Sequence, residues 1–306
     1  MKVFITGGTG FIGTKLTRGL VAAGHEVTIL TRSRRKVGGI HLPAVSYVRG
    51  NPTERGDWQA KLAGHDAVIN LAGASVFCRW TAGNKKSIAD SRIDATRHLV
   101  EALADRRAKV PTLLSASAMG YYGFRGDEEL DECSLPGADF LASVCRQWEA
   151  AARAAAQYGV RVVQCRFGLV LDKSGGALQK MLPAFQWGLG SPLGSGRQWL
   201  SWIHHGDLVN IFLFLLARPE VAGPVNFTAP QPVRNAEFSK ILGEVLQKPL
   251  FLPPVPALAV KLFLGEFGSV LLQGQRILPR KLLAGGYQFR FPALREALQD
   301  LLPATF

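Results

Sequence analysis

The hydrophobic pattern of residues 1–172 alternates between two kinds of segment. Short, nearly continuous apolar runs such as 2–6 (KVFIT) and 65–73 (HDAVINLAG) are typical of strands that are buried on both faces. Between them, apolar residues recur at helical spacing, as Leu16, Leu20 and Val21 do after the first run. This alternation predicts βαβ units and a mainly parallel sheet with helices on both faces.

The same pattern gives an expected list of elements. Strands are expected at 2–6, 26–32, 46–50, 65–73, 111–118 and 160–171. Helices are expected after the first strand and near 84–104, 138–157, 206–217, 235–246 and 256–272. After residue 172 the rhythm fades into a Gly-rich stretch. We therefore expect a Rossmann-type doubly wound α/β domain over 1–172. A smaller, mostly helical substrate lobe over 173–306 should pack closely on it and could add a strand to the sheet.

Composition narrows the class of protein. The chain has 306 residues, of which 47% are hydrophobic, enough for a sizeable core. The start MKVFITGG does not resemble a signal peptide, and the longest apolar stretch, 255–272, is interrupted by Lys261 and Glu266. Four isolated cysteines show no metal-ligand spacing and indicate a reducing compartment. We expect a cytoplasmic protein with no metal and no membrane partner.

The net charge of +13 suggests an anionic partner, although general solubility would explain it equally well. The basic residues are scattered, apart from RSRRK at 32–36, and no aromatic residues alternate with them. This distribution argues against nucleic acid as a partner. A small molecule that carries phosphate accounts better for the local cluster.

Gly7, Gly10 and Gly13 form a GxxGxxG loop directly between the first strand and the first helix. Glycines there allow a tight turn and a close approach of the backbone to a pyrophosphate, which then lies at the positive helix N-terminus. The loop stands in the strand–loop–helix context that this mechanism requires, so the sequence predicts a dinucleotide site.

The end of the second strand indicates which dinucleotide binds. An Asp or Glu there would accept a hydrogen bond from the 2′-hydroxyl of NAD. The chain has Thr31 and Arg32 instead, and a guanidinium can pair with a 2′-phosphate. Part of the RSRRK cluster could equally be a solvated loop. The sequence therefore favours NADP(H) over NAD(H).

Three motifs, TGGTGFIG (6–13), NLAG (70–73) and SASAMGYYG (115–123), resemble the extended short-chain dehydrogenase/reductase superfamily, the NAD-dependent epimerases and dehydratases. Longer stretches at 79–96, 140–152, 175–208 and 274–294 resemble its atypical branch of "epimerase family proteins", also called YfcH-like. The likeness runs nearly from end to end. It implies a Rossmann fold and a nicotinamide cofactor, but it does not imply a substrate.

The resemblance also implies a catalytic Tyr and Lys, four residues apart, in the helix near 138–157. Aligned on Glu149, those two positions hold Leu141 and Cys145, and neither residue can do that chemistry. Ser117 matches the family's substrate-orienting Ser. Arg92 stands where the family has Asn. It could reach cofactor phosphate or ribose, or it could be a solvated charge on a helix.

These considerations give the expected cofactor contacts. They are Gly7, Thr9, Gly10, Phe11, Ile12, Gly13, Thr31, Arg32, Leu71, Ala72, Gly73, Arg92, Ser115 and Val170.

Few other residues could take over the proton transfer that the missing Tyr would perform. Tyr121 and Tyr122 follow the strand that carries Ser117, so a phenol could act as the proton donor with Ser117 beside it. Alternatively, the GYYG turn is simply packed. Cys145 lacks a neighbouring His or Lys and reads as a core residue.

On the substrate side, Arg197, Trp202 and His204 are the expected contacts, although His204 also suits a structural strand end. The arginine that grips nucleotide diphosphate in the superfamily is replaced by Leu200, which weakens the case for a nucleotide sugar.

Two functions follow from these residues. One is an NADP(H)-dependent oxidoreductase or epimerase acting on a small polar substrate, as a monomer or homodimer. The other is an NADP(H)-binding sensor or interaction protein without turnover. The missing Tyr and Lys favour the second. The Trp- and Gly-rich segment 175–205 suggests a real ligand pocket and favours the first, which we prefer.

Overall fold

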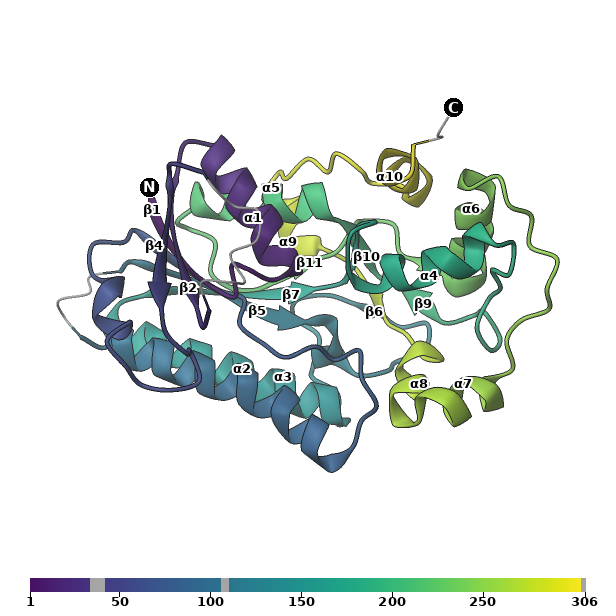
Figure 1. Cartoon of the computed structure of the whole chain (residues 1–306), viewed down its shortest axis with the longest axis horizontal. Helices are drawn as coiled ribbons and strands as arrows, with labels where there is room; N and C mark the ends of the chain where they lie inside the picture. Colours follow the sequence, from purple (N-terminus) through teal and green to yellow (C-terminus); the bar gives the residue numbers. More distant parts are fainter. Residues whose placement is uncertain (34–41, 106–109, 304–306) are drawn as a thin grey trace.

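The computed structural model describes residues 1–33, 42–105 and 110–303. Its main feature is a seven-stranded, wholly parallel sheet with the strand order β11-β7-β5-β4-β1-β2-β3 (Figure 1). The strands are β1 (Lys2–Thr6), β2 (Glu26–Thr31), β3 (Val45–Arg49), β4 (Ala67–Asn70), β5 (Thr112–Ala118), β7 (Arg161–Phe167) and β11 (Gly223–Phe227). This arrangement confirms the predicted Rossmann-type α/β fold.

Helices cover both faces of the sheet, and the strand side chains alternate between them. One face packs on α1 (Phe11–Ala22) and α5 (His205–Leu216), and Val3 and Ile5 of β1 point into this core. The other face packs on α2 (Ala82–Leu103) and α3 (Phe140–Arg153), and Phe4 of β1 points there. Figure 1 shows the two helical layers on opposite sides of the sheet. Each buried strand thus contributes to two cores, which explains why its sequence is apolar throughout.

A third core holds the C-terminal lobe together. It lies among α4 (Gly176–Gln186), α6 (Asn235–Val245) and α10 (Leu294–Leu301). The lobe also contains α7 (Ala257–Leu264), α8 (Glu266–Leu271) and α9 (Arg280–Ala284). Two short strand pairs join lobe and sheet domain: β8 (Leu169–Leu171) with β10 (Trp202–His204), and β6 (Glu129–Leu130) with β13 (Arg276–Ile277). A third pair, β9 (Trp199–Leu200) with β12 (Val233–Arg234), lies within the lobe. The described residues also include the 3-10 helices η2 (Gln59–Leu62), η3 (Met119–Tyr122) and η4 (Ala154–Tyr158).

Two expected elements are broken by glycine. The strand expected at 160–171 is two strands, because β7 ends before Gly168 and β8 turns away to pair with β10. A Cβ on Gly168 would lie 2.5 Å from the carbonyl oxygen of Ser201, so only glycine fits this crossing. The helix expected at 256–272 is α7 and α8, which meet at Gly265 with a φ of 61°.

The second half of the chain also completes the sheet domain. It supplies the edge strand β11 and the covering helix α5, both beyond residue 172. The division at residue 172 therefore marks a change in sequence pattern, while the sheet itself draws on both halves. Within the described ranges, no helix is long and apolar enough to cross a membrane.

Candidate cofactor and substrate site

The glycine loop lies at the carboxyl end of β1 and leads directly into α1. Gly7 has a φ of 69°, and its carbonyl oxygen accepts a hydrogen bond of 3.0 Å from the amide of Gly10. A Cβ on Gly13 would come within 2.3 Å of that same oxygen. The first turn of α1 can therefore pack against the loop only because this position is glycine. Thr9, Phe11 and Ile12 lie partly exposed around the turn.

The N-terminus of α1 is suited to an anion. No side chain caps it at Gly10, and its first turn carries no acidic residue. Amide groups of a first turn have no partner within the helix and add to the positive end of the helix dipole. A phosphate at this position would satisfy them, so the loop fits a pyrophosphate.

The end of β2 presents an arginine and no carboxylate. Thr31 is buried, and its hydroxyl donates to the carbonyl oxygen of Ser33 at 3.1 Å. Arg32 follows directly and is exposed. The rest of the predicted basic cluster, Arg34, Arg35 and Lys36, lies outside the described residues. The described end of β2 thus offers a cation to a ligand.

A buried polar network holds the ends of β1, β4 and β5 in register. The Thr6 hydroxyl donates to Asn70 Oδ1 at 2.6 Å, and Asn70 Nδ2 donates to Thr96 at 2.8 Å and to the Ser115 hydroxyl at 3.3 Å. The amide of Ala72 donates to the Thr6 hydroxyl at 3.3 Å. The network fixes the start of the loop 71–73, where Leu71 and Gly73 are more exposed than Ala72.

Arg92 reaches from α2 to this loop. Its guanidinium packs against Gly73, donates to the carbonyl oxygen of Ile88 at 2.9 Å and lies 5.3 Å from the centre of the Trp148 ring. Burial lowers the pKa of Arg92. No carboxylate of the described residues forms an ion pair with it. A half-buried cation without a counter-ion fits an anionic ligand at the edge of the loop.

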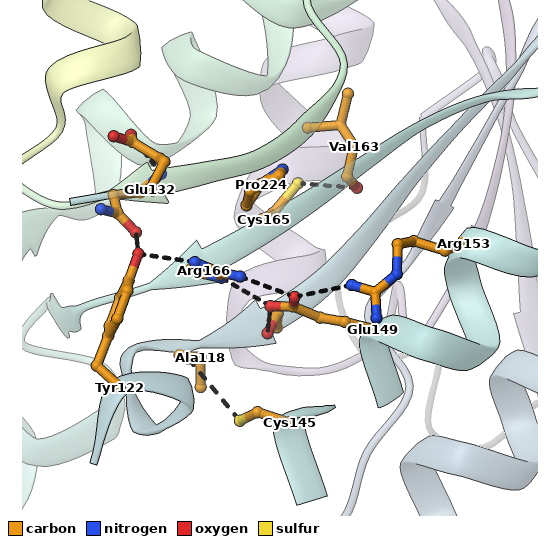
Figure 2. Close-up of polar contacts among 12 residues, drawn as sticks. Ala118, Tyr122, Glu132, Cys145, Glu149, Arg153, Val163, Cys165, Arg166 and Pro224 are labelled. Carbon is orange, nitrogen blue, oxygen red and sulfur yellow. Dashed lines mark hydrogen bonds and ion pairs between the residues drawn. The ribbon is translucent and has the colours of Figure 1, made fainter. Parts of the chain in front are cut away.

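A buried ion pair lies behind the carboxyl end of β5, as Figure 2 shows. Glu149 on α3 binds Arg166 on β7 in two places, with Nε 2.8 Å from Oε1 and Nη2 2.9 Å from Oε2. The Ser117 hydroxyl donates to the same carboxylate at 2.7 Å. Burial alone would lower the pKa of Arg166, but the hydrogen bond to Glu149 raises it above its usual value. The Ser117 hydroxyl therefore points into the interior, where it serves as a hydrogen-bond donor to the ion pair.

Tyr122 continues the network on the other side of Arg166 (Figure 2). Its hydroxyl donates to Asn226 Oδ1 at 2.6 Å and accepts from Arg166 Nη1 at 2.9 Å. Burial raises the pKa of Tyr122, so the phenol keeps its proton. Tyr121 is only half-buried, and the Arg166 guanidinium lies 3.5 Å from the centre of its ring. Of the three catalytic candidates, only Tyr121 keeps an exposed part.

Of the two positions that lack the family's Tyr and Lys, Cys145 is buried and Leu141 is partly buried. Leu141 covers Gly120, whose added Cβ would lie 3.0 Å from the leucine Cβ. Cys145 is buried, its thiol lies 3.8 Å from the carbonyl oxygen of Ala118, and burial raises its pKa to about 12. A thiol in this state is not a nucleophile at neutral pH, which agrees with its interpretation as a core residue.

The expected substrate contacts differ in exposure. Arg197 is exposed. Trp202 is buried, and its indole donates to the carbonyl oxygen of Gln231 at 2.9 Å. His204 is buried as well, and its Nδ1 caps α5 by accepting from the amide of Gly206 at 3.0 Å. The structure thus places Trp202 and His204 in the core, where their polar atoms serve the chain itself, and leaves Arg197 at the surface.

Two charged residues at the site, Lys15 and Asp172, were not singled out from the sequence. Lys15 of α1 lies 2.7 Å from Asp172, and His205 Nδ1 lies 2.9 Å from the same carboxylate. This cluster joins α1 to the end of β8, where Val170 is buried. A further hollow beside η3 is lined by Tyr122, 123–125, 136–139 and Gln273. No group of three or more His, Cys, Asp or Glu side chains in the described ranges could hold a metal ion.

Fold and glycine loop together define a nucleotide-binding protein of the Rossmann type. The model of the NAD dependent epimerase/dehydratase family matches residues 3–227, and a domain of unknown function, DUF1731, matches 255–301. The chain belongs to the NAD dependent epimerase/dehydratase family, within the short-chain dehydrogenase/reductase superfamily. The predicted family is thereby confirmed.

Individual relatives match over nearly the whole chain. The chain is 43% identical over 304 residues to the chloroplastic epimerase family protein SDR39U1 homolog of Arabidopsis thaliana, covering 99% of this chain and 87% of that protein. It is 44% identical over 300 residues to epimerase family protein Mb2239 of Mycobacterium bovis, covering 97% and 96%. The crystal structure of human epimerase family protein SDR39U1 with NADPH is similar with a TM-score of 0.86, at 35% identity and 99% coverage of both chains.

Removing the carboxylate of the buried ion pair should be costly. The substitution Glu149→Ala leaves Arg166 buried without a counter-ion, and we expect a loss of about 3–5 kcal/mol in the free energy of unfolding. Urea unfolding measures it. The matched control is Arg153→Ala, because this guanidinium lies 3.5 Å from Glu149 and its side chain is 54% exposed. We expect a loss below about 1 kcal/mol there. Equal losses would contradict the central role of the pair.

His204 should make the fold sensitive to acid. Burial, followed by the charge of His205, lowers the pKa of His204 to about 4, against 6.5 in the unfolded chain. Between these two pKa values, His204 binds a proton in the unfolded state but not in the folded state. The free energy of unfolding therefore decreases as the pH is lowered, by up to about 3 kcal/mol. Unfolding by urea at several pH values measures the loss.

The substitution His204→Asn separates this titration from capping, because Asn is a good N-cap without an ionisable group. We expect the variant to lose less stability than the parent between pH 6.5 and pH 4. Identical pH profiles would show that the acid sensitivity arises elsewhere.

Proposed function

We propose that this protein binds NADP(H) and uses it as an oxidoreductase or epimerase on a small polar substrate. The observation that carries the proposal is the electrostatic character of the glycine loop: the α1 N-terminus is uncapped, and the end of β2 carries Arg32 and no carboxylate. Similarity to a human protein solved with NADPH supports the choice of dinucleotide.

Each part of the loop would hold a different part of the cofactor. The first-turn amides of α1 fit the pyrophosphate, and Arg32 fits the 2′-phosphate. Arg92 fits a ribose or phosphate over Gly73, because no carboxylate among the described residues pairs with its guanidinium. When bound, the nicotinamide supplies hydride exchange; the residues described here bind and orient it.

We further propose Tyr121 as the group that moves a proton to or from the substrate. The hydroxyls of Ser117 and Tyr122 serve Glu149 and Asn226 in the interior, whereas Tyr121 is partly exposed at the same edge of the sheet. Ligands in open parallel sheets bind outside the carboxyl ends of the strands, which is where η3 lies.

One observation favours the second function, an NADP(H)-binding sensor without turnover. Leu141 and Cys145 occupy the positions of the family's Tyr and Lys; Leu141 is partly buried against Gly120, and Cys145 is buried. A site with this arrangement can still bind cofactor. The two functions therefore differ in turnover and share the cofactor.

The role of Arg32 can be tested by binding. Arg32→Ala removes the cation that fits the 2′-phosphate, so we expect the Kd for NADPH to rise by roughly 10- to 100-fold while the Kd for NADH stays unchanged. Isothermal titration calorimetry measures both. Arg97→Ala on the outer face of α2 is the matched control and should change neither. Tighter binding of NADH than of NADPH by the parent protein would rule out the proposed cofactor.

Turnover is tested on the intact protein. Native mass spectrometry identifies any small molecule that remains bound. The protein is then incubated with NADPH and a panel of aldehydes and ketones, and separately with NADP+ and a panel of nucleotide sugars. We expect NADPH consumption or sugar isomerisation, and a rate at least about 100-fold lower for Tyr121→Phe with unchanged Kd for NADPH. Cofactor binding without any turnover across the panel would favour the sensor.

A further inference from the structure

Exposed apolar side chains are concentrated at one end of the molecule. Among the described residues, eight of the thirteen exposed large hydrophobic side chains fall in 183–194 and 246–265. We call the surface that they form the apolar surface; it consists of Trp187, Leu189, Phe251, Leu252, Leu258, Leu262, Phe263 and Leu264. Contiguous apolar patches on a soluble protein mark sites of contact with a protein or a membrane.

Hydrogen bonds show that the two segments lie side by side. The Ser191 hydroxyl donates to the carbonyl oxygen of Pro253 at 2.6 Å, and the Val255 amide donates to that of Pro192 at 2.8 Å. Leu193 and Val255 form a parallel bridge. Helix α7 follows this bridge directly. Figure 1 shows α7 and the chain leading into it at the end of the molecule that also holds α4 and α6.

Helix α7 contributes half of the apolar surface, namely Leu258, Leu262, Phe263 and Leu264. Of its eight residues only Val260 is buried. Leu258, Leu262 and Phe263 are 78%, 73% and 79% exposed. Helices at the surface of a globular protein normally turn such residues towards the core. In α7 they point away from it, and Lys261 lies exposed among them.

The charges around the apolar surface indicate what it contacts. In segments 183–194 and 246–265, the ionisable side chains are Lys248 and Lys261. The nearest acidic residues in sequence, Glu244 and Glu266, are paired with Arg295 and Lys85. The whole chain carries a net charge of +13. A second copy would bring like charges together at this surface, whereas an anionic surface would attract them.

We propose that the apolar surface docks reversibly on an anionic lipid bilayer. Trp, Phe and Leu side chains interspersed with Lys and without acidic residues are typical of protein surfaces that lie in the lipid interface. The apolar side chains enter the headgroup region while Lys248 and Lys261 meet lipid phosphates. The proposal concerns attachment to the surface without a spanning helix, and it departs from the expectation that the protein has no membrane partner. It does not depend on the proposed NADP(H) chemistry.

The test is co-sedimentation with vesicles. We expect the full chain to bind vesicles of phosphatidylcholine mixed with phosphatidylglycerol, to bind pure phosphatidylcholine vesicles much less, and to be released by salt. Phe263→Ser and Trp187→Ser should each lower the partition coefficient roughly tenfold. Lys261→Glu should lower it roughly fivefold or more.

The matched control is Leu135→Ser. Leu135 is 73% exposed, like Leu262, but it lies in the loop before α3, outside the apolar surface. We expect this variant to bind vesicles as the parent protein does. Thermal unfolding of all variants should match the parent, because the substituted side chains are exposed.

Three outcomes would overturn the proposal. Vesicle binding that Phe263→Ser and Trp187→Ser leave unchanged would place the contact on another basic surface. A homodimer that these variants dissociate, seen by light scattering without vesicle binding, would assign the apolar surface to a second copy. If neither vesicle binding nor a dimer is observed, the apolar surface is assigned to contact with a protein partner.

Discussion

The buried ion pair between Glu149 and Arg166 determines how α3, β5 and β7 are joined, and the neighbouring polar groups depend on it. Two charges removed from water are tolerated only where their remaining hydrogen-bonding groups also find partners. Ser117 and Tyr122 supply those partners. Asn226 extends the network, because its backbone amide donates to Glu132 Oε1 at 3.0 Å. Hydroxyls at the place where the family does chemistry therefore stabilise the fold here.

The cofactor side has the opposite electrostatic design. The interior behind β5 is closed and neutralised, whereas Arg92 and the uncapped start of α1 carry positive charge for which the described residues supply no counter-ion. Buried or half-buried cations are costly unless a ligand completes them. The arrangement favours tight binding of a phosphate-rich molecule and limits the groups that remain for proton transfer. Binding and turnover are thus separable properties of this site.

Much of the fold was predictable because its determinants are local. The alternation of apolar strands and periodic helices, and the glycine loop between Thr6 and Phe11, follow from backbone and burial rules. The break at Gly168 was not predictable, because it depends on the carbonyl of Ser201, distant in sequence. The pairing of Glu149 with Arg166 is also non-local. Its only sequence signals are an arginine inside the apolar strand 160–171 and a glutamate beside Trp148 on the helix face that packs on the sheet.

The apolar surface and the proposed substrate side are connected through one segment. Residues 187–200 begin at the exposed Trp187 and end beside Trp199, whose indole donates to Asp127 at 2.8 Å and packs under Arg234. The amide of Gly194 donates to the carbonyl oxygen of Val255, so this segment is joined directly to the chain that leads into α7. Linkage is reciprocal. If docking on the bilayer changes the affinity of the protein for a ligand near Trp199, that ligand changes the affinity of the protein for the bilayer by the same factor.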